Sequence, residues 1–224
     1  LLKSGEVSIR EIPNERWKIS NFWKEGGPGN ISEGFSYAKI GAFVDSFSFD
    51  WKRHRTPPKS LTQIDLSQQW AVSVSASALE DAGYSEGNSD LPSARTGVVF
   101  ANALGGENRN LSNLRVWASK LANQAVDFGL PSQARGKFIE ALTAGTPRVD
   151  ENTMPGELAN VVAGRVANLL DLNGPNYTTD AACATTHAAL LDAARMLQSR
   201  QVDVAICGAS DRTMDPATFA KFSA

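Results

Sequence analysis

The sequence contains few residues that bind metal ions or cross-link a chain: two histidines, His54 and His187, and two cysteines, Cys183 and Cys207. Two histidines exclude a multi-histidine metal centre. The cysteines are too few for a disulfide scaffold, and they lack the C-x-x-C spacing of a zinc site. We therefore expect no metal and a reducing, cytoplasmic location.

The sequence also lacks a large excess of charge of one sign, and it lacks long apolar runs. Lys and Arg total 22 against 24 Asp and Glu, a formal net charge of −2, which argues against a polybasic nucleic-acid-binding protein. No apolar run reaches the roughly 18 residues that a membrane-spanning helix needs. Charges interrupt every apolar stretch in residues 1–16, so we expect no secretory signal there.

What is present is an ordinary globular composition, with 42% hydrophobic and 21% charged residues. The 224 residues suit one large domain or two small ones. The first residue is Leu1, and the last three, Phe222-Ser223-Ala224, carry no helix-stop signal. We therefore expect a piece of a longer protein that is incomplete at both ends.

Hydrophobic patterning predicts an α/β fold. The run Thr96 to Ala101 is apolar and rich in β-branched residues, which is typical of a buried strand. A four-residue apolar repeat predicts a helix at 65–82 that stops before Gly83. Further helices are expected at 111–126, 132–144 and 183–200, and further strands at 177–180 and 202–208. This order predicts a parallel or mixed sheet covered by helices.

Residues 1–60 have a different character. Glycines and prolines punctuate them, and aromatic residues are dense between these breaks. Such aromatic density predicts a segment that packs onto a core rather than a free linker. We expect residues 61–224 to form the regular α/β part of the chain.

Residues Met154 to Leu170 predict one continuous helix. Pro155 suits its first turn, and Leu158, Val162 and Val166 recur every four residues as one apolar stripe. On spacing alone, Met154 and Leu158 are core residues of this helix.

The segment Asp180-Ala-Ala-Cys183-Ala-Thr-Thr carries the sharpest chemical signal. Cys183 falls between a β-prone segment and a helix, where unpaired backbone N–H groups and the helix dipole favour a thiolate. The small alanines on either side leave room for a substrate. Such a thiolate is a nucleophile near neutral pH. Spacing alone leaves a buried structural cysteine as an equal alternative.

Other candidate groups have simpler interpretations. His187 follows Cys183 by about one helical turn and would suit thiol activation, but a helix-surface residue is the simpler interpretation. Cys207 lies in a predicted buried strand, where cysteine acts as a small hydrophobic residue. The basic cluster at 51–55 predicts a solvated loop, with docking of an acyl carrier or a phosphate as the alternative.

The stretch from Gly174 to Ser210 resembles the nucleophile segment of the β-ketoacyl synthases, the condensing enzymes of the thiolase fold. The positions that match the family pattern are Gly174, Pro175, Asp180, Ala182, Cys183, Ala184, Thr185, Asp203, Gly208 and Ala209. Leu2-x-x-Gly5 with Ile12-Pro-x-x-Arg16-Trp17 resembles the opening of multidomain ketosynthases, and Pro155 to Gly164 resembles the helix that lines their acyl pocket. The chain looks more like ketosynthase domains of type I polyketide or polyunsaturated-fatty-acid synthases than like stand-alone bacterial enzymes.

The resemblance implies the N-terminal half of a thiolase-like fold, a mixed sheet layered with helices. It implies that Cys183 is the catalytic nucleophile of an acyltransferase of the 3-oxoacyl-carrier-protein synthase type. That reaction is a decarboxylative Claisen condensation of an acyl thioester with malonyl-carrier protein, in fatty-acid or polyketide synthesis. Met154 and Leu158 would border the acyl pocket.

The resemblance also implies partners. An acyl carrier protein would present the substrates on its phosphopantetheine arm, and no cofactor would bind directly. A homodimer would form across the strand near Tyr177 to Asp180.

Some family motifs are missing from the sequence: the glycine-rich first strand, and the two histidines and one lysine in HGTGT-like and GHxxxA-like motifs. His54 and His187 do not match those motifs. We therefore expect these residues alone not to complete the condensation. The alternatives are another thiolase-fold enzyme or a non-catalytic scaffold that docks carrier proteins. Cys183 argues against a loading-type domain, which carries Gln instead.

Overall fold

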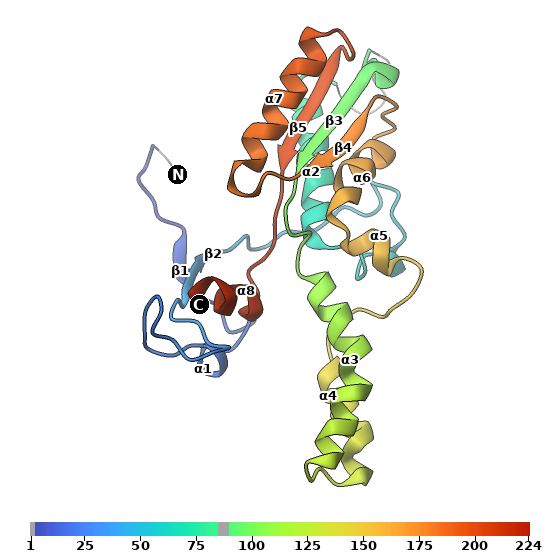
Figure 1. The fold of residues 1–224 in the computed structure, drawn as a ribbon. Coiled ribbons are helices and arrows are strands. Elements are labelled where there is room, and N and C mark those ends of the chain that lie inside the picture. Colours follow the sequence, from blue (N-terminus) through green and yellow to red (C-terminus); the bar gives the residue numbers. More distant parts are fainter. Residues whose placement is uncertain (1–2, 85–89) are drawn as a thin grey trace. The chain divides into compact units, whose positions relative to one another are not determined.

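The computed structural model describes residues 3–84 and 90–224 (Figure 1). The chain divides into two compact units. One unit is Phe49–Arg212 and contains a three-stranded sheet with its covering helices. The other joins residues 3–48 to Thr213–Ala224.

The sheet unit alternates strands and helices as the patterning predicts. Its elements are α2 (Leu66–Asp81), β3 (Thr96–Ala101), α3 (Asn108–Asp127), α4 (Arg135–Thr143), α5 (Thr153–Glu157), α6 (Val162–Leu169), β4 (Asn176–Thr179), α7 (Thr185–Gln198) and β5 (Val204–Ala209). The predicted helices at 65–82, 111–126 and 132–144 and the strand at 96–101 are confirmed within a few residues. The expected α/β fold is therefore present.

The sheet has the order β4-β3-β5, and both pairings are parallel. All six residues of the central strand β3 are buried, which explains its nearly uninterrupted apolar sequence. Gly174 permits the close approach of the chain that leads into β4, because a Cβ there would lie 2.3 Å from the carbonyl oxygen of Thr96.

Helices cover both faces of this sheet (Figure 1). On one face, α7 contributes Ala189, Ala193 and Met196 to a buried cluster with Val99 and Ala101 of β3. The alternate β3 residues Val98 and Phe100 point to the other face because strand side chains alternate. Helix α6 contacts β3 and β4 there, and α2 contacts α6 and β5.

The prediction of one helix from Met154 to Leu170 is wrong. Helix α5 ends at Glu157, Leu158 takes an extended conformation, and a 3-10 turn at Ala159–Val161 leads into α6. The carbonyl oxygens of Pro155, Gly156 and Leu158 all accept hydrogen bonds from residues of α2 or the segment before it. These long-range donors stabilise a break that local periodicity does not reveal.

The second unit contains β1 (Ile9–Glu11), α1 (Ile19–Phe22), β2 (Ile40–Ala42) and α8 (Pro216–Ser223). Strands β1 and β2 pair antiparallel. Trp17 is buried and packs edge-on against Phe22 and Phe219. Its Nε1 donates to the carbonyl oxygen of Met214, 3.1 Å away. Aromatic packing therefore joins the N-terminal segment to the last helix.

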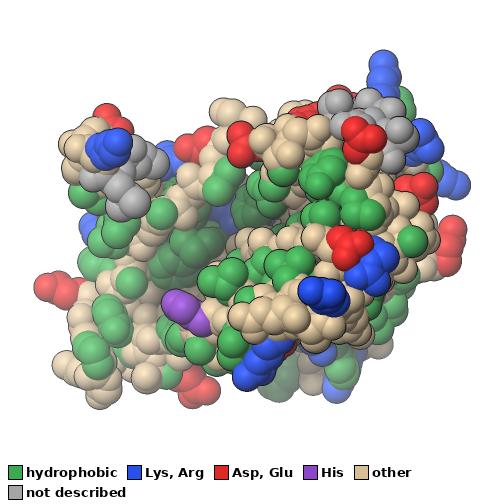
Figure 2. All heavy atoms as spheres, turned by 90° about the horizontal axis from the view of Figure 1, so that it is seen from above, with side chains coloured by type: hydrophobic (Ala, Val, Ile, Leu, Met, Phe, Trp, Pro, Cys, Tyr) green, Lys and Arg blue, Asp and Glu red, His purple; other side chains and the backbone are tan. Residues whose placement is uncertain are grey.

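Surface charges are mixed on the face that Figure 2 views. Lys, Arg, Asp and Glu side chains are interspersed with hydrophobic ones, and no large area of one charge sign is visible there. In the part of the chain that the structure describes, no helix is both long and apolar enough to cross a membrane.

Candidate active site

Cys183 lies in the turn between β4 and α7. A 3-10 turn at Ala182–Ala184 carries it, and α7 begins two residues later at Thr185. The Cys183 side chain is exposed. A reagent can therefore reach this thiol without opening the core.

Two polar side chains brace the Cys183 turn. The Oδ1 atom of Asp180 accepts from the backbone N–H of Ala182 at 2.8 Å. The hydroxyl of Thr185 accepts from the N–H of Ala181 at 2.8 Å and donates to the carbonyl oxygen of Ala182. Ala182 has a φ of 50°, in the left-handed region that alanine rarely adopts. These hydrogen bonds stabilise a strained turn next to the thiol.

A cavity of about 210 Å³ adjoins this turn. Its lining comes from the ends of β3 and β5 and from the start of α7: Ala101, Asn102, Ala103, Ala182, Thr185, Thr186, Ala209, Ser210 and Asp211. The carboxyl ends of parallel strands are the usual place for ligand sites in α/β sheets. Cys183 does not line this cavity, but Ala182 and Thr185 on either side of it do, so the cavity beside Cys183 is the candidate substrate site.

Asn102 fixes the strand ends at this cavity. Its Nδ2 donates to the carbonyl oxygen of Ser210 at 2.6 Å, and its Oδ1 accepts from the N–H of Gly105 at 2.7 Å. The side chain thus links the loop after β3 to the end of β5. Sequence reasoning missed this residue. The available signal was a polar residue directly after a buried strand.

The other thiol has a different environment. Cys207 lies opposite Val99 in the β5–β3 pairing and packs against the cluster beneath α7. Burial raises the pKa of the Cys207 thiol. Cys207 is therefore the less reactive of the two cysteines on physical grounds.

Neither histidine is placed as a catalytic group by its surroundings. His187 is exposed on α7. His54 is buried and stacks on Phe49 with ring centroids 4.9 Å apart. The prediction of a solvated loop at 51–55 is therefore wrong for His54, although Lys52 and Arg55 are exposed. Arg53 of the same turn forms an ion pair with Glu80.

The two predicted pocket residues lie in and just after α5. Met154 is exposed, and Leu158 is half-buried. The residues that line the cavity beside Cys183 include neither of them. Their role at the acyl pocket therefore stays a prediction.

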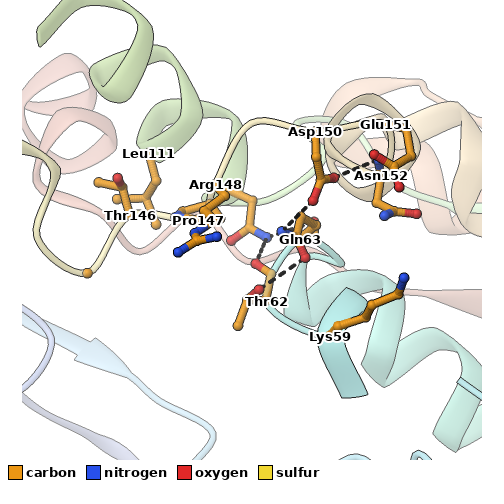
Figure 3. A pocket seen from close by; sticks show the side chains of 12 residues that line it. Lys59, Thr62, Gln63, Leu111, Thr146, Pro147, Arg148, Asp150, Glu151 and Asn152 are labelled. Atoms are coloured by element: carbon orange, nitrogen blue, oxygen red, sulfur yellow. Dashed lines mark hydrogen bonds between the residues drawn. The ribbon is translucent and has the colours of Figure 1, made fainter. Parts of the chain in front are cut away.

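A second, larger cavity of about 700 Å³ lies between the segment before α2, the start of α3 and the loop between α4 and α5 (Figure 3). Most of the residues that line it have polar or charged side chains. Gln63 donates through Nε2 to Asp150 at 3.1 Å, and Thr62 donates to Gln63 at 3.0 Å (Figure 3). Within residues 3–84 and 90–224, no cluster of three His, Cys, Asp or Glu side chains is placed to hold a metal ion.

Comparison with known proteins identifies the family. The model of the β-ketoacyl synthase N-terminal domain matches residues 1–224. The chain is 27% identical over 223 residues to the PKS-NRPS hybrid synthetase ATPKS of Aspergillus niger, covering 99% of this chain and 10% of that protein. It is 28% identical over 220 residues to a phenolphthiocerol/phthiocerol polyketide synthase of Mycobacterium tuberculosis, covering 97% and 10%.

The fold also agrees with a solved structure, an oxazolomycin ketosynthase domain of Streptomyces albus JA3453. The TM-score is 0.71 at 22% identity, over 98% of this chain and 32% of that chain. This likeness supports the thiolase-like fold. The chain spans about a tenth of the length of the two curated relatives. Because the family model covers all 224 residues, the chain belongs to the β-ketoacyl synthases and corresponds to their N-terminal domain.

Proposed function

We propose that this chain supplies the acyl-accepting half of a ketosynthase in polyketide synthesis. The observation that carries the proposal is the position of Cys183, exposed on a braced turn beside a cavity, in a chain that the ketosynthase family model covers throughout. The relatives that match over nearly the whole chain are polyketide synthases by name. This supports polyketide synthesis over fatty-acid synthesis.

The proposed reaction has two stages. The Cys183 thiolate attacks the carbonyl carbon of an acyl thioester on the phosphopantetheine arm of an acyl carrier protein. The carbon–sulfur bond to pantetheine breaks, the pantetheine thiolate leaves and takes a proton from water, and the acyl group is held on Cys183 as a thioester. Malonyl-carrier protein then loses CO₂, and its carbanion attacks that thioester. A carbon–carbon bond forms, the Cys183 thiolate is released, and the 3-oxoacyl product remains on the carrier.

Charge develops on the thioester oxygen in both stages, and backbone N–H groups would hold it, with that of Cys183 among them. The histidines that stabilise the malonyl-derived enolate in the family lie in motifs that these 224 residues do not contain. Cofactors would not bind directly. A cytoplasmic location is part of the same proposal.

We further propose a homodimer across β4. Strand β4 is at one edge of the three-stranded sheet, and an edge strand offers unpaired backbone groups to another chain. Tyr177 on this strand is 40% exposed. Burial and the neighbouring Asp192 raise the pKa of Tyr177. Analytical ultracentrifugation tests the dimer, and a monomer at micromolar concentration would contradict it.

The test of the function uses the complete ketosynthase domain that contains these residues. It is incubated with a labelled acyl thioester and malonyl-carrier protein, and the Cys183 peptide and the 3-oxoacyl product are measured by mass spectrometry. Cys183→Ala should lose both signals, and Cys207→Ala should retain both. Product from Cys183→Ala would refute the proposal. Acylation of Cys183 without product would favour the scaffold alternative.

The same assay on residues 1–224 alone tests whether these residues accept an acyl group without completing the condensation. We expect weak acylation of Cys183 and no condensation, because a missing charge-stabilising donor costs about 10²–10³ in rate. Turnover comparable to that of the complete domain would place the catalytic donors within these residues.

A further inference from the structure

Two side chains from other helices hold the last residues of α5 together with Leu158, a segment called here the Pro155–Leu158 turn. Gln68 on α2 is fully buried, and its Nε2 donates to the carbonyl oxygens of Pro155 at 3.1 Å and Leu158 at 3.2 Å. Its Oε1 accepts from the Nε of Arg165 on α6. Arg165 also donates through Nη2 to the Pro155 oxygen at 3.0 Å. One carboxamide and one guanidinium thus hold both ends of the Pro155–Leu158 turn.

The backbone around this turn leaves it little room to move. The N–H of Asp65 donates to the Gly156 carbonyl oxygen at 2.8 Å. A Cβ at Gly156 would lie 2.1 Å from the carbonyl oxygen of Gln63. The chain is therefore tightly packed at Gly156, and the Gln68 and Arg165 hydrogen bonds add side-chain contacts at Pro155 and Leu158 on either side of it.

Stability alone explains this arrangement poorly. Arg165 is half-buried, and this burial lowers its pKa, so part of the hydration of its charge is lost. The oxygens that it binds, on Gln68 and Pro155, carry no formal charge. The guanidinium of Arg165 has its N–H donors in a rigid fork, so it holds the groups that it binds in a fixed geometry.

We propose that Gln68 and Arg165 are positioning residues that set acyl-chain selectivity by fixing Met154 and Leu158. This inference rests on the proposed function and on the prediction, made from the family resemblance, that Met154 and Leu158 border the acyl pocket. A wall that shifts by one carbon–carbon bond, about 1.5 Å, admits or excludes about one methylene. One methylene in an apolar pocket changes selectivity by about 10–200-fold. Small movements of this turn should therefore be visible in the chain-length preference.

The chain offers a matched pair of variants. Gln69, the next residue on α2, is also buried, and its Nε2 also donates to two carbonyl oxygens, those of Leu61 and Ile64. Gln68→Met and Gln69→Met each remove one buried carboxamide that donates two hydrogen bonds. Only Gln68→Met removes hydrogen bonds to the Pro155–Leu158 turn. kcat/KM is measured for a series of acyl thioesters with the complete ketosynthase domain.

We expect Gln68→Met to change the ratio between the preferred chain and one two carbons longer by about tenfold. Gln69→Met should leave this ratio within about twofold. The rate of backbone amide hydrogen exchange at residues 153–162 is a second measurement. This rate should rise in Gln68→Met and stay unchanged in Gln69→Met. If Gln68→Met does not fold, Arg165→Lys takes its place, since it keeps the charge and removes the fork.

Equal shifts in both glutamine variants would overturn the inference, because the profile would then follow stability alone. An unchanged profile in Gln68→Met or Arg165→Lys, with Cys183 still acylated, would also overturn it and leave the proposed function intact. Failure of the unmodified domain to acylate Cys183 at all would refute the proposed function and, with it, this inference.

Discussion

The carboxylate of Asp65 joins the starts of two helices, because its Oδ2 accepts from the backbone N–H of Asn108 at 2.9 Å. Its Oδ1 accepts from the N–H of Ser67 at 2.8 Å and caps α2. Asp65 is fully buried. Gly106 is required beside it, because Gly106 has a φ of 121° and a Cβ there would lie 2.1 Å from the carboxylate. One side chain thus fixes α2 relative to α3.

Replacing Asp65 should destabilise the sheet unit. Asp65→Ala removes two helix-start hydrogen bonds, each worth about 0.5–2 kcal/mol, so the free energy of unfolding should fall by about 1–4 kcal/mol. Asp65→Asn keeps one oxygen acceptor and should lose less. Urea denaturation measures both variants. A loss below about 1 kcal/mol for Asp65→Ala would show that the two caps are not important for stability.

The two thiols should differ in reactivity at neutral pH. Cys183 is exposed, whereas burial raises the pKa of the half-buried Cys207. We expect limited iodoacetamide treatment of the folded domain to label Cys183 at least about tenfold faster. Labelling of Cys207 should begin only at a more alkaline pH than for an ordinary thiol. Peptide mapping across a pH series measures both rates, and equal labelling would count against the assignment.

Enlarging Leu158 tests whether this residue borders the acyl pocket. If it does, Leu158→Trp should shorten the longest acyl chain that the complete domain accepts, while the melting temperature changes little. If Leu158 only fills the core, overpacking should cost about 1–3 kcal/mol. Chain-length profiles and melting curves on the same variant decide. A large loss of stability with an unchanged profile would exclude the pocket role.

The ion pair between Arg95 and Asp203 should give an acid-dependent contribution to stability. Arg95 binds both carboxylate oxygens, at 2.6 and 2.7 Å, and holds the pKa of Asp203 below its usual value. A depressed carboxyl pKa stabilises the fold above the unfolded-state pKa of about 3.9. This stability is lost as the pH falls through the lower folded value.

Asp203→Asn should therefore unfold at a lower urea concentration than the unmodified domain at pH 7. The difference in urea midpoint between Asp203→Asn and the unmodified domain should become smaller below about pH 4. Added salt should narrow it as well, because both side chains are about half exposed. A difference that stays constant with pH would show that the charge on Asp203 does not contribute.

Local sequence determined most of the secondary structure. The β-branched run at Thr96–Ala101 has all six side chains buried, as the central strand of a parallel sheet requires. The start of α7 after Cys183 likewise follows from a β-prone segment that gives way to an alanine-rich one. These features depend on neighbouring residues, so a single sequence contains the information for them.

Tertiary structure decided the features that depend on distant partners. The break at Leu158 is stabilised by Gln68, 90 positions earlier in the chain, so the apolar repeat at 154–170 predicted a helix that does not continue. His54 is buried because Phe49 stacks on it, although its neighbours are charged. The cavity beside Cys183 exists only where β3 and β5 end together at α7. The periodicity of apolar residues shows which face of a helix or strand is apolar. Which hydrogen-bond donor, aromatic ring or strand end contacts that face is determined only by the folded chain.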